Sequence, residues 1–372
     1  MKVLQVITKG EVGGAQSHVL TLCRELTRQG VAVQVAIGGA DPHPPLAHAL
    51  EASHLAVHRV PALGNTLNPV HVMRAAWALR GMVREQSPDL LHAHSAMAGV
   101  VARLAGALTR TPVIYSVHGF AFKAGHPWKR RTVAFAMEWL LAPLTRRMIC
   151  VSDHERRLAL VLPLLSRRVS VIHNGVEDVA VPGNSAASTA EAAPAIAMVA
   201  RMAPPKRPDI LLHALAQLRG ALRHEVPATF FGGGPELAAH CALAHRLGLQ
   251  AVRFTGDVDD VAAQLAQHAI FVLASDHEGL PISLIEAMRA GMAIVASDLP
   301  GIRELLPDAA HARLVAPDPA AWAAALRQLI ESPALRARMG AAARQRYEQH
   351  YTAQRMVLAV RSVYAEATSR TH

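Results

Sequence analysis

Two glutamates, Glu278 and Glu286, stand eight positions apart in the segment SDHEGLPISLIEAM (275–288). Paired carboxylates are typical of acid and base catalysis, in which two groups share a proton or act on one atom. At about 100° of rotation per residue, however, this spacing places the two side chains about 80° apart around a helix. We therefore expect them to contact different groups, one before a helix and the other inside it.

Two cations, Arg201 and Lys206, lie in RMAPPKRPD (201–209), a proline-stiffened turn that follows an apolar run. Arg can hold a phosphate oxygen pair through a forked contact, whereas Lys acts as a point charge. At the end of a strand, the two cations are predicted to hold a diphosphate. A merely solvated charged loop is the alternative.

Glycines mark two turns between a strand and a helix. Gly13 and Gly14 lie in KGEVGGAQSH (9–18), and Gly233 is central in FFGGGPEL (230–237). Glycine lets a backbone approach a ligand closely, and the start of a helix favours anionic groups. The first turn is not GxGxxG, and no ribose-binding acid follows the second strand, so a dinucleotide site is not expected. Tight packing without a ligand remains an open interpretation of both turns.

Histidines end two other apolar runs, in HAHS (92–95) and SVHG (116–119). His92 and His94 have the spacing of a metal pair, but no third acidic or cysteine ligand is evident, so no metal site is predicted. His118, before a glycine, is better placed to accept a proton from a substrate or to hydrogen-bond to it. A hydrogen-bonded core histidine is the alternative for each.

The elements that must position these residues are short apolar runs that alternate with helical segments. AQSHVLTLCRELTRQG (15–30) and HVMRAAWALRGMVREQS (71–87) are examples of the helices. The runs read as buried parallel strands. They are VLQVIT, AVQVAIG, DLLHAHS, VIYSVHG, RMICVS and VSVIHNG in the first half, and AIAMVAR, ATFFGGG, VRFTGDV, AIFVLAS, AIVASD and ARLVAP in the second.

A stretch rich in Pro, Gly, Ser and Ala separates the two series of runs and reads as a linker at 181–194. We predict an α/β protein with two doubly wound, Rossmann-like domains, 1–180 and 195–341, that face each other across a cleft. Ligands in such folds bind at the carboxyl ends of the strands, where all the candidate motifs fall.

Charge is unevenly distributed along the 372 residues. The first 180 carry 20 Lys and Arg against 11 Asp and Glu, and the rest are almost balanced within a total of +10. A basic half suggests an anionic partner, which could be a phosphorylated substrate or an acidic lipid surface. Nucleic acid is not expected, because no such motif occurs and aromatic residues make up only 4%. A solvated basic surface is an equally good interpretation.

The segment HPWKRRTVAFAMEWLLAPLTRR (126–147) is amphipathic, basic at both ends and carries Trp128 and Trp139. It could lie on an anionic bilayer, or it could be a core helix with a charged outer face. It is too short and too charged to span a membrane. With no secretory signal evident and three scattered cysteines, the protein is expected to be cytoplasmic, with peripheral contact to the inner membrane face as an option.

These motifs together resemble the retaining GT-B glycosyltransferases of family 4. The similarity rests on EGLPISLIEAM, the Arg201 and Lys206 turn, FGGGPE, ICVSDHERR, VIHNGV and the first GGAQ loop, and it extends over nearly the whole chain. The pattern is most similar to bacterial enzymes that build capsule, lipopolysaccharide or exopolysaccharide. The chain departs from it at Arg207-Pro208, at Pro300-Gly301 and in HARLV (311–315).

The resemblance implies a role for each candidate residue. Glu278 would face the donor sugar, and Glu286 would accept hydrogen bonds from the ribose. The remaining donor contacts would be with backbone, diphosphate and base; they are Gly13, Gly14, Arg201, Lys206, Gly233, Asp257, Val258, Gly279, Leu280 and Pro281. His118 would lie beside the transferred sugar or the acceptor. The C-terminal helices from about 342 to 372 would return to the first domain.

The function implied is a retaining, metal-independent hexosyltransferase that needs no cofactor. It would move a sugar from a nucleoside diphosphate sugar to a lipid-linked or growing polysaccharide acceptor. Arg and Lys would stabilise the leaving diphosphate in place of a metal. A nucleotide-sugar 2-epimerase of the same fold and an inactive binding subunit are the alternatives. The epimerase would need further carboxylates that the first half does not offer, and a scaffold would not need these four charged residues together.

Overall fold

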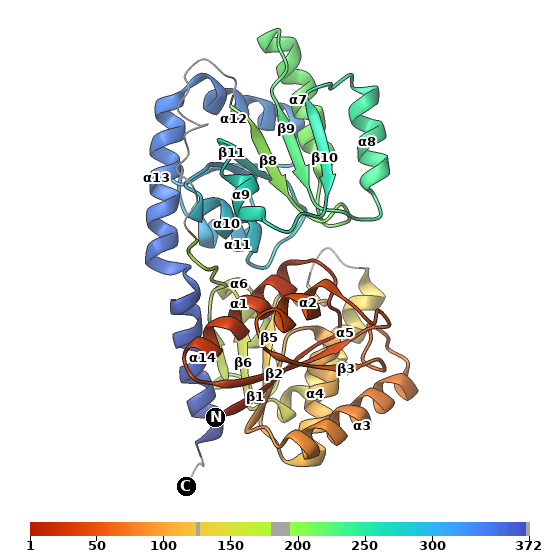
Figure 1. Cartoon of the computed structure of the whole chain (residues 1–372). Coiled ribbons are helices and arrows are strands. Elements are labelled where there is room, and N and C mark those ends of the chain that lie inside the picture. The colour runs from red at the N-terminus through yellow and green to blue at the C-terminus, as the bar shows by residue number, and fades with distance from the viewer. Residues whose placement is uncertain (124–126, 180–193, 370–372) are drawn as a thin grey trace. The chain divides into compact units, whose positions relative to one another are not determined.

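The computed structural model describes residues 1–123, 127–179 and 194–369, which form two compact units (Figure 1). Unit 1 comprises Met1–Glu177 and Ala353–His372, and unit 2 comprises Asp178–Thr352. The linker predicted at 181–194 lies outside the described residues, apart from Pro194. The predicted return at about 342 falls inside helix α13 (Pro333–His350), and the C-terminal part of unit 1 begins at Ala353.

The described residues of unit 1 form a seven-stranded, wholly parallel sheet in the order β3-β2-β1-β4-β5-β6-β7. The strands are β1 (Lys2–Ile7), β2 (Ala32–Gly38), β3 (Ala56–Val60), β4 (Leu90–Ala93), β5 (Val113–Val117), β6 (Arg147–Cys150) and β7 (Val169–Val171). Parallel strands need crossover connections, and here most of them are helices.

Helices cover both faces of this sheet. Side chains alternate along a strand, so in β1 Leu4 and Val6 join one buried cluster, whereas Val3 and Ile7 join the other. The first cluster includes residues of α3 (Pro69–Gln86), α4 (Ala96–Thr109) and α6 (Asp153–Ala159). The second includes residues of α1 (Gly14–Arg28), α2 (Pro45–Glu51) and α14 (Ala353–Thr368). The remaining helices of the unit are α5 (Trp128–Leu141) and the short η1 (Ala142–Leu144).

The described residues of unit 2 form a six-stranded parallel sheet in the order β10-β9-β8-β11-β12-β13. The strands are β8 (Ile196–Val199), β9 (Ala228–Phe231), β10 (Val252–Gly256), β11 (Ile270–Leu273), β12 (Ala293–Ser297) and β13 (Arg313–Val315). The helices besides α13 are α7 (Pro208–Leu222), α8 (Leu237–Arg246), α9 (Val261–Leu265), α10 (Ile282–Arg289), α11 (Pro300–Leu305) and α12 (Pro319–Glu331).

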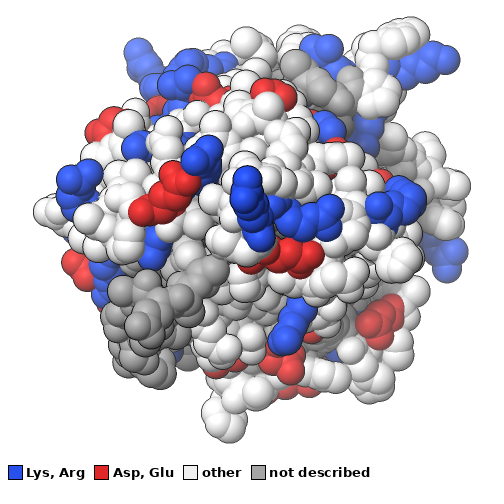
Figure 2. Space-filling model, turned by 90° about the horizontal axis from the view of Figure 1, so that it is seen from above, with Lys and Arg blue, Asp and Glu red and all other residues white. Residues whose placement is uncertain are grey.

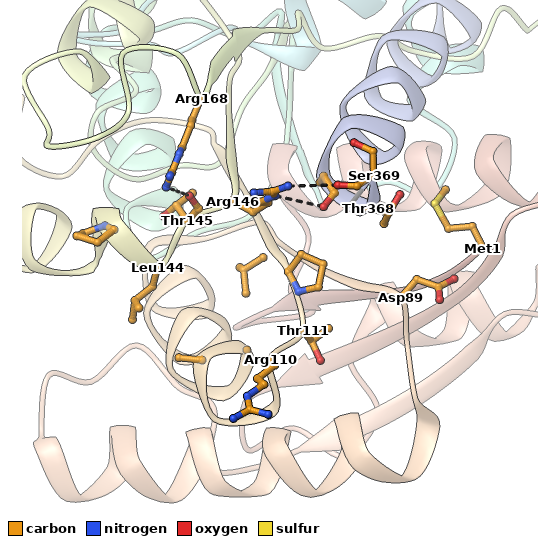
Figure 3. A pocket seen from close by; sticks show the side chains of 16 residues that line it. Met1, Asp89, Arg110, Thr111, Leu144, Thr145, Arg146, Arg168, Thr368 and Ser369 are labelled. Carbon is orange, nitrogen blue, oxygen red and sulfur yellow. Dashed lines mark hydrogen bonds between the residues drawn. The ribbon is translucent and has the colours of Figure 1, made fainter. Parts of the chain in front are cut away.

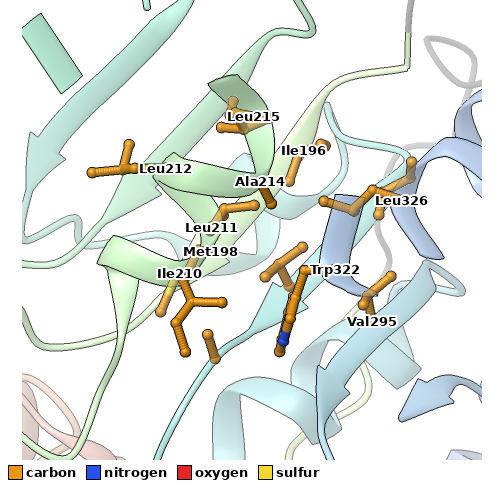
Figure 4. Packing of buried hydrophobic residues seen from close by; sticks show 14 of the residues in the cluster. Ile196, Met198, Ile210, Leu211, Leu212, Ala214, Leu215, Val295, Trp322 and Leu326 are labelled. Carbon is orange, nitrogen blue, oxygen red and sulfur yellow. The ribbon is translucent and has the colours of Figure 1, made fainter. Parts of the chain in front are cut away.

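Trp322 of α12 is fully buried and packs with α7 residues against one face of the second sheet (Figure 4). Its indole N–H donates to the carbonyl of Ala316 at 2.9 Å, so burying this polar atom leaves it paired. Helix α13 contacts α10 and β12. These contacts fix α10, which carries Glu286.

Both sheets have the doubly wound order, which confirms the predicted fold class for each unit. In each, the chain changes direction between two neighbouring strands, β1 and β4 in unit 1 and β8 and β11 in unit 2. The crevice outside the carboxyl ends of such a pair is where this topology places ligands.

All twelve predicted strands occur in the described residues, but a thirteenth, β3, was missed. Its sequence AVHRV contains the adjacent polar residues His58 and Arg59, and four of its five residues are half-buried or exposed. It lies at the edge of the sheet, where one side needs no strand neighbour. The search for continuous apolar runs therefore could not find it.

Candidate active site

The topology brings two distant segments together at the point where the second sheet changes direction. One follows β8 and the other follows β11. The backbone N–H of Arg207 donates to the carbonyl of Ala274 at 3.0 Å, and that of Asp276 donates to the carbonyl of Pro205 at 2.9 Å. The Ser275 hydroxyl also donates to Pro205, at 3.1 Å. Hydrogen bonds thus join the turn that carries Arg201 and Lys206 to the segment that leads into the EGLP turn.

Lys206 and Glu278 form an ion pair between these two joined turns, and the Lys206 ammonium donates to Oε1 of the Glu278 carboxylate. Their side chains are only 18% and 10% exposed. The sequence predicted both residues at the site but not that they pair. Each charge is mostly shielded from water, so neither is stable without a partner. A ligand whose anionic group binds Lys206 must therefore also offer a hydrogen-bond donor to Glu278.

The turn Gly279–Pro281 leads directly into α10, and Pro281 gives its first turn no side-chain cap. Backbone N–H groups at such a helix start favour anions. A Cβ atom on Gly301 would lie 1.8 Å from the carbonyl oxygen of Gly279. Gly301, one of the departures from the family pattern, therefore supports the turn through a close backbone approach.

Glu286 lies within α10 and is half-buried. Burial raises the pKa of its carboxyl to about 7, against the opposing effect of the positive charge of Arg289. Glu278 is engaged by Lys206 in the loop. The two carboxylates therefore have different surroundings, as their spacing predicted.

The second glycine turn packs its backbone against the segment after β8. Gly232 and Gly234 have φ angles of 124° and 148°, and Cβ atoms there would lie 2.2 Å from the Ala200 carbonyl oxygen and 2.5 Å from that of Met202. For these two, packing explains the glycine. The N–H of Gly233 donates to Oδ1 of the exposed Asp257 at 2.7 Å, which joins this turn to the Asp257-Val258 segment.

Gly13 and Gly14 open α1 in unit 1. Gly13 precedes the helix with extended backbone, and Gly14 is exposed with nothing within 4 Å of a Cβ built on it. Packing among the described residues therefore does not require Gly14, which leaves room for a ligand at the helix start.

His118 follows β5 and belongs to a histidine cluster with His18 of α1 and His94 after β4. Ring centroids are 4.7 Å apart for His18 and His118, and 5.4 Å for His18 and His94. Burial lowers the pKa of His118 to about 4 and takes the pKa values of His18 and His94 well below the usual range. The three rings are therefore neutral at pH 7.

His92, considered from the sequence as a partner of His94, has other contacts. Its Nδ1 lies 2.7 Å from the Tyr364 hydroxyl, and its Nε2 lies 2.8 Å from the Ser116 hydroxyl. The nearby cluster contains His18 instead. His18 belongs to the motif KGEVGGAQSH but was not predicted as a site residue. It lies one helical turn into α1, at the same edge of the sheet as His94 and His118, and that position was the available sequence signal.

Glu155 of α6 was also missed as a residue that shapes the loop after His118. Its carboxylate is buried, accepts the backbone N–H of Phe120 at 2.9 Å and pairs with Lys123 at 3.0 Å. It lies in the quoted ICVSDHERR motif, where Ser152 caps the helix. The available sequence signal for Glu155 was its position as a charged residue in the first turn of a helix beside the site.

A pocket of about 820 Å³ lies at the opposite, amino edge of the first sheet (Figure 3). Arg146 donates there to the carbonyls of Ala367 and Ser369, and Arg168 donates to that of Thr145 (Figure 3). None of the predicted site residues lines it. Its position, before the strands rather than after them, separates it from the candidate site.

Helix α5 is a surface helix. Trp128, Trp139 and Leu140 are 70%, 49% and 67% exposed, and the buried Glu138 pairs with Arg103 of α4 at 2.9 Å. An apolar outer face next to Lys129 and the following arginines therefore replaces the core helix considered from the sequence. No helix among the described residues is both long and apolar enough to cross a bilayer.

Basic and acidic side chains are interspersed on the face of the molecule shown in Figure 2. The described residues drawn there form no large patch of a single charge. That face therefore offers no electrostatic footprint for a polyanion.

Two family models match the chain. The model described as Glycosyltransferase Family 4 matches residues 12–180, and that described as Glycosyl transferases group 1 matches residues 184–346. Together they extend over both predicted domains and include the site residues of each.

Curated relatives agree with these models. D-inositol 3-phosphate glycosyltransferase of Kineococcus radiotolerans is 29% identical over 393 residues, with 91% of this chain and 87% of that protein covered. UDP-Gal:alpha-D-GlcNAc-diphosphoundecaprenol alpha-1,3-galactosyltransferase of Escherichia coli is 27% identical over 260 residues, which cover 65% of this chain and 66% of that enzyme.

Solved structures show the same fold. Anabaena HepE in complex with UDP and glucose superposes with a TM-score of 0.84 at 20% identity and covers 98% of this chain and 99% of that one. The lipopolysaccharide outer core galactosyltransferase WaaB superposes with a TM-score of 0.71 at 16% identity, and the match covers 98% of this chain and 100% of that one.

Proposed function

Because the chain belongs to the glycosyltransferases of group 1 and family 4, we propose that it transfers a hexose from a nucleoside diphosphate sugar with retention at the anomeric carbon and without a metal ion. Membership makes it a transferase and sets aside the epimerase and the inactive subunit. The observation that carries the proposal is the shielded Lys206–Glu278 pair beside the Arg201 turn, where the second sheet changes direction.

Lys206 and Arg201 neutralise the diphosphate as it leaves. Glycosyl transfer builds negative charge on the leaving oxygen, and a fixed cation stabilises it most where water is excluded. Glu278 holds the Lys206 ammonium group within this site. Chain cations thereby take the place of a metal ion.

We propose the remaining donor contacts from the family resemblance. Glu278 faces the sugar once Lys206 turns to the phosphate, and the Gly279–Pro281 backbone contacts sugar hydroxyls and phosphate. Glu286 accepts hydrogen bonds from the ribose. Gly233 and the Asp257-Val258 segment, joined by a 2.7 Å hydrogen bond, border the base.

Unit 1 supplies the acceptor side. His118, whose Nε2 has no hydrogen-bond partner among the described residues, contacts the transferred sugar or the acceptor. Gly13 and Gly14 admit the donor phosphates at the start of α1, where packing leaves Gly14 open.

The acceptor is lipid-linked or a growing saccharide, at the inner face of the plasma membrane. The Escherichia coli relative is named for a diphosphoundecaprenol acceptor. The excess of basic residues before position 180 and the exposed tryptophans of α5 also support contact with an anionic bilayer.

A donor screen tests the function. Thermal shift is measured with nucleoside diphosphates and nucleotide sugars, and one of them should stabilise the fold as its concentration passes the Kd. The matching sugar is then supplied with a lipid-diphosphate saccharide acceptor, and the anomeric configuration of the product is determined by NMR. A product with retained configuration, formed equally with and without chelator, is expected. An inverted product, or strong inhibition by chelator, contradicts the proposal.

A further inference from the structure

A second chemical centre lies in unit 1, where its sheet changes direction. His18 comes from α1, His94 follows β4 and His118 follows β5, so three elements bring imidazoles to one point. One nitrogen of each ring can be chosen such that all three lie within 4.8 Å of one another. The roles proposed above use only His118.

Most ring nitrogens of the three histidines lack a hydrogen-bond partner. They are both nitrogens of His18, Nδ1 of His94 and Nε2 of His118, which make no hydrogen bond of standard geometry among the described residues, although the Asn174 side chain lies close enough to interact with His18. His18 and His94 are 5% and 0% exposed, so bulk water does not replace those partners. Buried polar atoms are normally paired, and a group of convergent unpaired atoms indicates a missing ligand.

Hydrogen bonds fix the tautomer of His94. The Gln5 amide donates from Nε2 to the Tyr364 hydroxyl at 3.0 Å, which leaves its Oε1 to accept from His94 Nε2 at 2.7 Å. His94 Nε2 therefore carries the proton, and Nδ1 keeps a free lone pair. A carbonyl oxygen that holds the far N–H of a histidine is the usual outer partner of a metal-binding imidazole.

We propose that His18, His94 and His118 bind a transition metal ion of the zinc class, with the fourth coordination position open to water. Three imidazoles and one open position are a common zinc arrangement, and Co²⁺ takes the same ligands. Nitrogens bound to one tetrahedral zinc lie about 3.3 Å apart, so binding draws the three rings together. The two histidines next to His118 thus gain a function that the transfer reaction does not give them.

Cobalt binding tests the site directly. Tag-free, chelator-treated full-length protein is titrated with Co²⁺, and one equivalent should produce the strong visible d–d bands that aqueous Co²⁺ lacks. His18→Asn, His94→Asn and His118→Asn should each weaken binding by more than the about 10–100-fold typical of losing an outer partner. Zn²⁺ should raise the Tm of the unchanged protein and not that of the variants.

A surface site is the main competing explanation. His43 and His48 are exposed, with ring centroids 5.9 Å apart, and could bind cobalt themselves. His43→Gln should leave the bands unchanged. Loss of the bands in His43→Gln, their persistence in all three cluster variants, or their absence from the unchanged protein overturns the proposal. Circular dichroism identifies any variant that fails to fold. If the variants at the buried His18 and His94 do not fold, His118→Asn, at a half-buried position, still tests the site.

A consequence for activity rests on the function proposed above. A metal ion on His118 removes that ring from the sugar, so micromolar Zn²⁺ should inhibit transfer and excess chelator should restore it. The cobalt spectra need no transfer activity. A failure of the proposed function would therefore leave the metal site testable, and a failure of the metal site would leave the donor screen unaffected.

Discussion

At the scale of single residues, the Lys206–Glu278 pair carries the proposed chemistry. Lys206→Ala should lower the transfer rate by about 10²–10³-fold, the loss found when one group that stabilises transition-state charge is removed. Glu278→Ala should lose most transfer as well, because it removes the sugar contact and the group that positions Lys206. Initial rates at saturating donor measure both effects.

The control is Arg327→Ala, which breaks an exposed ion pair with Glu331 in the same unit and should keep full activity. Stability provides a second readout. Each single substitution leaves a mostly buried charge without its partner, whereas the double substitution leaves none. Urea melts should therefore find the double variant at least as stable as either single one. Near-normal turnover in both singles would refute the site assignment.

Glu286 predicts a pH dependence of donor binding. Burial raises the pKa of its carboxyl to about 7, so its ionised fraction falls as the pH drops through that value. Ribose hydroxyls donate to the ionised form. Affinity for the nucleotide sugar should therefore decrease below pH 7, by a factor approaching about tenfold per pH unit. Calorimetric titration with the nucleotide sugar is suitable, because its diphosphate does not titrate in this range.

The matched variant is Glu286→Gln, which should bind more weakly and show no such pH dependence. The sign of the effect on stability is also fixed. Because the folded pKa lies above the usual 4.5, the unfolded chain releases its proton first, and this group makes the ligand-free fold less stable as the pH rises from 4.5 to about 7. An unchanged pH profile in Glu286→Gln would assign the effect to another group.

The sequence predicted which residues lie at the site better than it predicted the contacts between their side chains. Arg201, Lys206 and Glu278 could be placed, because parallel strands bring their ends to one edge whatever the details of packing. Their pairing could not, since it depends on side-chain positions across 72 residues of chain. His18 was missed for a related reason: a histidine inside an amphipathic helix looks like any other until the strand order sets His94 and His118 beside it.

At the scale of elements, the meeting of α11 with the EGLP turn should control donor binding. Gly301→Ala places a Cβ atom against the Gly279 carbonyl, and since the contact is with backbone, the turn itself must shift. We expect affinity for the donor to fall by at least tenfold, because backbone groups aimed at sugar and phosphate lose their alignment. Calorimetric titration with the nucleotide sugar identified in the donor screen measures this affinity.

Gly220→Ala in α7 is the matched control, since nothing lies within 4 Å of its added Cβ. In a helix interior that change is neutral or stabilises by about 0.5–1 kcal/mol, and donor affinity should stay the same. Equal affinity in Gly301→Ala and the unchanged protein would show that the turn does not depend on this approach.

Twelve strands could be predicted, three of them at a sheet edge, whereas the edge strand β3 could not. A strand covered by helices on both sides is largely apolar, and this is the signal that most of the twelve segments carry. β3 has one neighbouring strand and contains the adjacent polar residues His58 and Arg59. Helix α5 was recognised as a helix, but its amphipathic pattern left open which side faced outward. In the structure the buried Arg103–Glu138 pair marks the inner side of this helix, and both tryptophans are exposed.

At the scale of the whole molecule, the uneven charge gives the last prediction. The first 180 residues hold 20 of the 38 Lys and Arg but only 11 of the 28 Asp and Glu, and α5 adds exposed Trp128, Trp139 and Leu140. Basic residues near an anionic bilayer contribute about 1 kcal/mol each, and buried apolar side chains add to this. The protein should therefore bind vesicles that contain anionic lipid, and binding should weaken as salt rises.

The two contributions can be separated in vesicle co-sedimentation. Trp139→Ser should weaken binding at every salt concentration, because it removes apolar insertion, and Lys129→Gln should mainly reduce the salt dependence. Leu358→Ser on α14, equally an exposed apolar side chain of unit 1, should bind like the unchanged protein. If the protein stays off anionic vesicles even at low salt, the basic half is simply a solvated surface. Transfer to a lipid-linked acceptor would then require the acceptor to be extracted from the bilayer.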